Sequence, residues 1–124
     1  MLQKLAWVFG IVLLAVGVLG FVPGVTTSDL LLGIFTVDSL HNIIHILSGA
    51  LALVAVLYAK EYVRLYFQVF GVVYGVVAVL GFVQSDSVLG LIMVNTADNL
   101  LHLVIAASAL YAGFWLKEGG PSYG

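Results

Sequence analysis

The chain has 124 residues, of which 63% are hydrophobic and 8% charged, and its formal net charge is −2. A soluble domain is ordinarily about 25% charged, and one this short has too little interior to bury so much apolar surface. The charge balance excludes a basic nucleic-acid surface, and the lack of cysteine excludes disulfides and thiolate metal sites. The composition therefore predicts an integral membrane protein.

Stretches free of Asp, Glu, Lys and Arg predict four transmembrane helices. In chain order they are Leu5–Val22, Ser39–Ala59, Leu65–Ser85 and Asn99–Leu116. A helix rises about 1.5 Å per residue, so about 20 apolar residues cross the hydrocarbon core. The stretches lack the alternation of transmembrane β-strands. We therefore expect an all-α membrane protein, folded as an up-down-up-down bundle of four helices.

The charged residues between these stretches predict the orientation. The four basic residues all lie on one side of the predicted membrane: Lys4, Lys60, Arg64 and Lys117. The aspartates all lie on the other side: Asp29, Asp38, Asp86 and Asp98. By the positive-inside rule, this distribution predicts that the N- and C-termini are both cytoplasmic.

A tandem repeat divides the chain into two similar halves. Val18–Val22 recurs unchanged as Val79–Val83, and Gly33–Glu61 aligns without a gap with Gly90–Glu118. The copied positions include asparagine, histidine and a Lys-Glu pair, which apolar composition alone would not reproduce. The close copy in the third stretch also argues against the alternative that the first stretch is a cleaved signal peptide.

The repeat predicts the domain organisation. A single membrane domain, 1–118, consists of repeats 5–61 and 65–118, and a Gly/Pro/Ser tail, 119–124, is expected to be flexible. Because each repeat holds an even number of helices, the two are parallel and related by a pseudo-two-fold axis along the membrane normal.

The two outer loops carry matched apolar segments, Leu31–Val37 and Val88–Val94. A two-fold axis along the membrane normal would make these segments antiparallel neighbours. We therefore expect a short β-hairpin-like cap on the extracytoplasmic side, formed by pairing between the loops. A re-entrant or interfacial loop is the alternative, since backbone at this depth has to be paired or hydrated.

Polar side chains gather near the outer ends of the second and fourth helices. They are Asp38, His41, Asn42 and His45 on the second helix, and Asn95, Asp98, Asn99 and His102 on the fourth. Their spacing puts each set on one helical face, and the repeat puts both faces at the same depth. Because polar groups facing lipid are costly, these should point inward. The plainest interpretation is structural, with helix caps and interhelical hydrogen bonds.

Metal binding is a more specific interpretation of the same residues. Imidazole and carboxylate together suit zinc, iron or copper, and the candidate ligands are His41, His45, Asp98 and His102. The pattern lacks the glutamate of the H-E-x-x-H motif, which makes it less specific.

Two other functions are open from the sequence. Haem could be held by axial ligands His45 and His102, although close helix packing at Gly49 and Ala106 would leave little room for a macrocycle. An ion or proton pathway ordinarily needs an ionisable residue near mid-membrane, and the deeper halves of the spans offer only Tyr74.

The sequence does not predict an enzyme. Ser48 follows His45 by three residues, but no third residue is placed to orient the pair, and neither a P-loop nor a dinucleotide-binding motif is present. The leading interpretation is a structural scaffold or accessory subunit without a cofactor. Its partners would be the lipid bilayer and either other membrane subunits or copies of itself, and not nucleic acid.

These motifs resemble a known family. They are similar to a prokaryotic family of four-helix membrane proteins catalogued as a domain of unknown function. In the first half the similar segments are Leu32–Asp38, His41–His45 and Ser48–Ala50, and in the second half they are Gly90–Asn95 and Asp98–His102. The resemblance covers Leu5–Leu116, and its most specific element is Asn-x-x-His near the start of helices two and four. The two halves differ at two positions, with Ala106 in place of Gly49 and Asp98 in place of His41. The resemblance implies a multi-pass protein of a bacterial or archaeal inner (plasma) membrane, and no activity.

Overall fold

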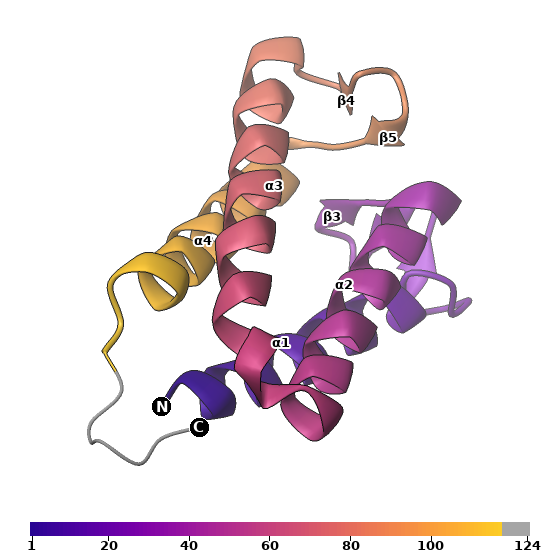
Figure 1. Ribbon diagram of the computed structural model, residues 1–124. Coiled ribbons are helices and arrows are strands. Elements are labelled where there is room, and N and C mark those ends of the chain that lie inside the picture. Colours follow the sequence, from indigo (N-terminus) through magenta and orange to yellow (C-terminus); the bar gives the residue numbers. More distant parts are fainter. Residues whose placement is uncertain (118–124) are drawn as a thin grey trace.

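The computed structural model describes residues 1–117, and four long helices dominate them (Figure 1). The helices are α1 (Leu2–Leu19), α2 (Ser39–Tyr58), α3 (Val63–Gln84) and α4 (Thr96–Phe114), and a short 3-10 helix, η1 (Lys60–Tyr62), joins α2 to α3. The four helices, α3 taken together with η1, are long and apolar enough to cross a membrane, as predicted. The predicted flexible tail, 119–124, lies outside the described residues.

The helices pack as two pairs, each formed by one half of the chain. α1 lies along α2 and α3 lies along α4, and the two pairs meet at α2 and α3. Glycine permits the close approach within a pair: a Cβ atom at Gly49 would lie 2.5 Å from the Leu14 nitrogen and 2.7 Å from the Gly10 oxygen. Gly10 packs on Leu53 in the first half as the equivalent Gly71 packs on Leu110 in the second. Gly10, Gly49 and Gly71 therefore serve packing within the chain.

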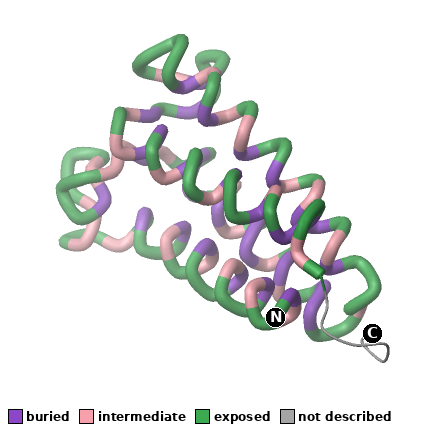
Figure 2. The backbone as a smooth tube through the Cα atoms, turned by 90° about the vertical axis from the view of Figure 1, so that its left-hand side faces the viewer, coloured by how far each residue is buried: buried purple, intermediate pink, exposed green. Residues whose placement is uncertain are grey.

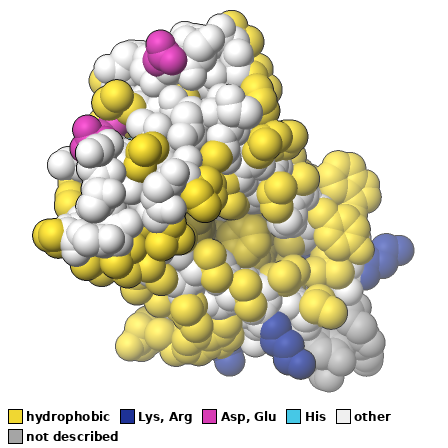
Figure 3. Space-filling view, turned by 180° about the vertical axis from the view of Figure 1, so that it is seen from behind, with side chains coloured by type: hydrophobic (Ala, Val, Ile, Leu, Met, Phe, Trp, Pro, Cys, Tyr) yellow, Lys and Arg dark blue, Asp and Glu magenta, His cyan; other side chains and the backbone are white. Residues whose placement is uncertain are grey.

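The two ends of the bundle differ in charge. In the face shown in Figure 3, Lys and Arg side chains gather at one end, acidic side chains at the other, and apolar side chains cover the band between them. Figure 1 shows the strands at the end opposite the N-terminus. We call these the basic end (Lys4, Lys60, Arg64 and Lys117) and the hairpin end (residues 26–36 and 87–93). The outward helix faces are exposed and the inward faces buried (Figure 2), which suits an apolar surface solvated by lipid.

Each outer loop folds into its own small sheet. β1 (Thr26–Thr27), β2 (Leu30–Leu31) and β3 (Phe35–Thr36) form one antiparallel sheet, and β4 (Ser87–Val88) pairs with β5 (Ile92–Met93) in a hairpin. The predicted hairpin-like cap is therefore present, but the strands pair within each loop and not between the loops as expected.

Local turns explain this pairing. The β2–β3 and β4–β5 connections are three-residue turns centred on Gly33 and Gly90, whose φ angles are 71° and 69°. Glycine adopts positive φ without a steric penalty, so the two strands of each hairpin turn back on each other and pair within the same loop.

Two apolar clusters hold the bundle together. The larger lies toward the basic end and consists of Leu2, Ala6, Ala52, Ala55, Val56, Val63, Tyr66, Phe67, Ala109 and Ala112. The smaller places Val88, Ile92 and Val94 of the second outer loop against Ile44, Val77 and Leu80. The polar face of α2 and α4 therefore lies on the hairpin side of the main apolar core.

Arg64 fixes the basic end of α4. Its guanidinium donates hydrogen bonds to the carbonyl oxygens of Ala112, Gly113 and Leu116 at 3.2, 3.3 and 2.9 Å. The last carbonyls of a helix lack intrahelical donors, and a cation there also complements the helix dipole. The contact joins α3 to α4 at the end opposite the polar face.

Candidate metal centre

Capping side chains hold the first turns of α2 and α4. The Asp38 carboxylate accepts a hydrogen bond from the His41 nitrogen at 2.8 Å and another from the Met93 nitrogen of β5 at 2.6 Å. Asn95 and Asp98 form a capping box, in which the side chain of each accepts from the backbone N–H of the other at 2.9 Å. These bonds satisfy backbone donors that a helix start leaves free, and they fix the orientation of the polar face.

The two halves also exchange hydrogen bonds at equivalent positions. His41 occupies the place in the first half that Asp98 occupies in the second. The His41 Nδ1 atom lies 2.9 Å from the carbonyl oxygen of Met93, and the Asp98 carboxylate accepts from the backbone of Thr36, the equivalent of Met93. A histidine can donate to a carbonyl whereas a carboxylate can only accept. The donor His41 therefore meets a backbone carbonyl, and the acceptor Asp98 meets a backbone N–H at the equivalent position.

Three imidazoles converge inside the bundle at this level. His41 and His45 come from α2 and His102 from α4, all three are buried, and their candidate ligand nitrogens lie within 4.8 Å of one another. The Nε2 atoms of His41 and His102 are 3.4 Å apart. The ring centroids are 4.7 Å apart for His41 and His45 and 5.7 Å apart for His45 and His102. Residues from both halves thus form one cluster.

Several buried atoms of the polar face have no hydrogen-bond partner among the described residues. They are Asn42 Oδ1, His45 Nδ1, His45 Nε2, Asn99 Oδ1 and His102 Nδ1. Most buried polar atoms in proteins are bonded, and each unpaired one costs about 1–3 kcal/mol. Capping and interhelical bonding explain Asp38, Asn95 and Asp98, but they leave the nitrogens of His45 unexplained. A bound ion would satisfy one of these two nitrogens.

The tautomer of His41 suits a metal ligand. Because the Met93 oxygen can only accept, a neutral His41 ring carries its proton on Nδ1 and presents the lone pair of Nε2 to the cluster. Metal-binding histidines commonly donate their other ring N–H to a backbone carbonyl in this way. Nitrogens about 2.0–2.1 Å from a tetrahedral ion lie about 3.3–3.4 Å apart, and His41 Nε2 and His102 Nε2 are separated by 3.4 Å.

The structure brings together three of the four metal ligands predicted from the sequence. Asp98 is buried nearby, but its carboxylate is engaged by the backbone of Asn95 and Thr36 and does not join the three imidazoles. The cluster also favours an ion over haem. The rings of His45 and His102 are in contact with His41 and Tyr74, so a flat macrocycle between them would have to displace both neighbours.

Tyr74 of α3 was noted in the sequence only as an ionisable residue deep in the membrane, and its place beside the histidines was not predicted. Its ring centroid lies 5.6 Å from that of His102 and 6.3 Å from that of His45, and its hydroxyl donates to Ser48 Oγ at 3.0 Å. A signal for this role was present, because Tyr74 replaces Leu13 in an otherwise closely copied segment of the repeat.

Four membrane-compatible helices in two parallel halves, with buried polar side chains near one end, define a small four-helix integral membrane protein. Residues 3–115 match the family described as "Domain of unknown function (DUF4383)", and the chain belongs to this family. The match confirms the resemblance drawn from the Asn-x-x-His motifs and covers nearly all the described residues. No curated protein and no solved structure matches the chain.

Proposed function

We propose that this membrane protein binds one divalent transition-metal ion, held by the imidazoles of His41, His45 and His102, and that it is not an enzyme. The observation that carries the proposal is the convergence of three buried imidazoles within 4.8 Å, with both ring nitrogens of His45 and the Nδ1 atom of His102 unpaired among the described residues. Nitrogen ligands suit zinc and copper, whereas calcium and magnesium prefer oxygen. The arrangement supports this function better than a purely structural scaffold, which would gain nothing from unpaired imidazoles.

The charge of the ion has a source of compensation nearby. Asp38 is the N-cap residue of α2 and Asp98 lies in the first turn of α4, both beside the cluster, and each carboxylate is held by backbone donors. A cation bound by neutral imidazoles inside a bundle benefits from such carboxylates even where they do not coordinate it. Three protein ligands would leave a fourth tetrahedral position open.

Metal analysis of the purified full chain tests the proposal. After loading with Zn²⁺ and removal of excess, we expect about one ion per chain, and X-ray absorption should show nitrogen neighbours at about 2.0–2.1 Å. His41→Ala, His45→Ala and His102→Ala should each weaken Zn²⁺ binding by about 100-fold or more. Tyr74→Phe is the matched control, since it keeps the packed ring and alters no ligand. Stoichiometric zinc that survives in all three histidine variants would contradict the site.

The proposal includes the orientation and location of the protein. Both termini face the cytoplasm of a prokaryotic inner membrane, so the metal centre lies near the extracytoplasmic surface. The support is the gathering of Lys4, Lys60, Arg64 and Lys117 at one end of the bundle. Because the chain has no cysteine, single cysteines can report the side directly. In intact cells, an impermeant maleimide should label Leu32→Cys and spare Lys60→Cys, and the reverse pattern would refute the orientation.

A further inference from the structure

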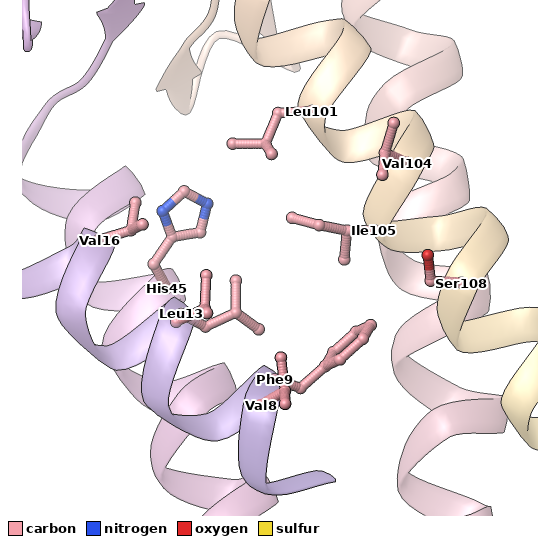
Figure 4. A pocket seen from close by; sticks show the side chains of 10 residues that line it. Val8, Phe9, Leu13, Val16, His45, Leu101, Val104, Ile105 and Ser108 are labelled. Carbon is pink, nitrogen blue, oxygen red and sulfur yellow. The ribbon is translucent and has the colours of Figure 1, made fainter. Parts of the chain in front are cut away.

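A cavity of about 160 Å³ lies between α1 and α4, on a seam between the two halves of the chain (Figure 4). Its lining is almost wholly apolar and includes Phe9, Leu13, Val16, Leu101 and Ile105, with the ring of His45 from α2 also facing it. Val8, Val12 and Val104 at its edge are among the exposed residues of the outward helix faces. A molecule reaching this cavity therefore comes from the surrounding hydrocarbon.

The repeat indicates what shape fits the cavity. The alignment of Phe9-Gly10 with Phe70-Gly71 makes Leu13 of α1 the equivalent of Tyr74 of α3. The alignment of His45 with His102 makes Ile105 of α4 the equivalent of Ser48 of α2. In the second half, the phenol ring of Tyr74 is buried beside His102, with ring centroids 5.6 Å apart, and its hydroxyl bonds to Ser48 Oγ.

The first half lacks that ring. Leu13 and Ile105 stand where Tyr74 and Ser48 stand in the second half, and the cavity lies beside His45 as Tyr74 lies beside His102. An apolar cavity of about 150 Å³ is large enough to hold a benzene ring. The cavity thus has the size and the relation to an imidazole that a six-membered ring requires.

We infer that the cavity between α1 and α4 binds the ring of a membrane-dissolved quinone that carries an alkyl or isoprenoid tail. The lipid-facing edge requires a hydrocarbon-soluble ligand, and Tyr74 shows that a ring with an oxygen substituent fits beside His102, the equivalent of His45. An oxygen is also required because both nitrogens of His45 lack a partner among the described residues, and a quinone carbonyl accepts an N–H hydrogen bond. A plain acyl chain would fill the volume and leave those nitrogens unpaired.

Ring binding does not depend on the metal. An imidazole has two nitrogens, so His45 can give one to an ion and use the other toward a ligand. His41, by contrast, has its second nitrogen engaged by Met93 and does not line the cavity.

Equilibrium binding of a short-chain alkylated benzoquinone to the full chain in quinone-free nanodiscs tests the inference. We expect saturable binding. Leu13→Tyr, alone or with Ile105→Ser, should lower the affinity for the quinone at least about tenfold, because the new tyrosine ring would fill the cavity as Tyr74 fills the equivalent space in the second half. His45→Gln should also weaken binding, by about tenfold, through loss of one hydrogen bond. Val18→Tyr adds the same ring to the exposed face of α1, outside the cavity lining, and should leave binding unchanged.

The outcomes separate the ring site from the metal centre. If the Leu13→Tyr variant still binds zinc but no longer binds the quinone, the protein is folded and its cavity is filled. His41→Ala should lose zinc and keep quinone binding. Equal affinity for an alkyl alcohol of the same chain length would identify a lipid chain as the occupant and overturn the inference. Unchanged quinone binding in Leu13→Tyr would also overturn it, whatever the zinc content.

Discussion

Replacement of Gly49 by alanine is expected to lower the free energy of unfolding by about 3 kcal/mol, near the upper end of ordinary overpacking effects. The added Cβ would lie 2.5 Å from the Leu14 nitrogen and 2.7 Å from the Gly10 oxygen. Both are backbone atoms of α1, so they cannot move aside as a flexible side chain would. The α1–α2 pair would have to separate along much of its length, with loss of the packing that holds the first half together.

Gly75→Ala is the matched control, because it makes the same change in another membrane-spanning helix. A Cβ there would meet only the Ala106 Cβ atom, at the ordinary contact distance of 3.8 Å. Since alanine favours a helix by up to about 1 kcal/mol over glycine, this variant should be neutral or slightly more stable. Equilibrium unfolding in mixed micelles, followed by circular dichroism, compares the two. Equal losses would show that α1 and α2 do not approach as closely as described.

Asp38→Ala is expected to lower the free energy of unfolding by about 2–4 kcal/mol and to loosen the β4–β5 hairpin. One carboxylate oxygen caps α2 through the His41 nitrogen, and the other holds the Met93 nitrogen at 2.6 Å. The cap alone contributes about 1 kcal/mol, and a charge-assisted bond to a backbone donor adds about 1.5–3 kcal/mol. The alanine variant leaves both donors without this acceptor.

Hydrogen exchange measures the local part of this effect. The Met93 amide should lose protection in Asp38→Ala by more than global destabilisation explains. Asp86→Ala is the control, since Asp86 is an exposed aspartate in the same outer region. If the Met93 amide exchanges equally in both variants, Asp38 does not hold the hairpin.

The sequence predicted the helices well because their physical cause is local. A stretch of about 20 apolar residues has few stable arrangements other than a membrane-spanning helix, and α2 begins at Ser39 as predicted. The repeat then predicted which residues of the two halves lie close together. Residues copied at the same spacing in parallel halves lie at the same depth, which predicted that His45 and His102 would be neighbours.

Other features depended on interactions that no local pattern reveals. The carboxylate of Asp98 satisfies backbone donors of Asn95 and Thr36. These bonds hold it away from the three imidazoles with which the sequence had grouped it as a candidate metal ligand. The strands pair within loops because Gly33 and Gly90 close local turns. Matched apolar sequences are equally compatible with either pairing, so only the turn geometry decides between them.

Because Asp98 stands in the second half where His41 stands in the first, the duplicated chain differs from a dimer of identical halves in the number of imidazoles it brings together. Strict two-fold symmetry supplies ligands in even numbers: two copies of the first half would bring four imidazoles to the axis, and two copies of the second half only a pair with two carboxylates. Joining unlike halves in one polypeptide allows an odd set, two imidazoles from α2 and one from α4. Covalent fusion of two unlike halves thus allows an odd number of imidazoles to meet inside an otherwise two-fold symmetric bundle.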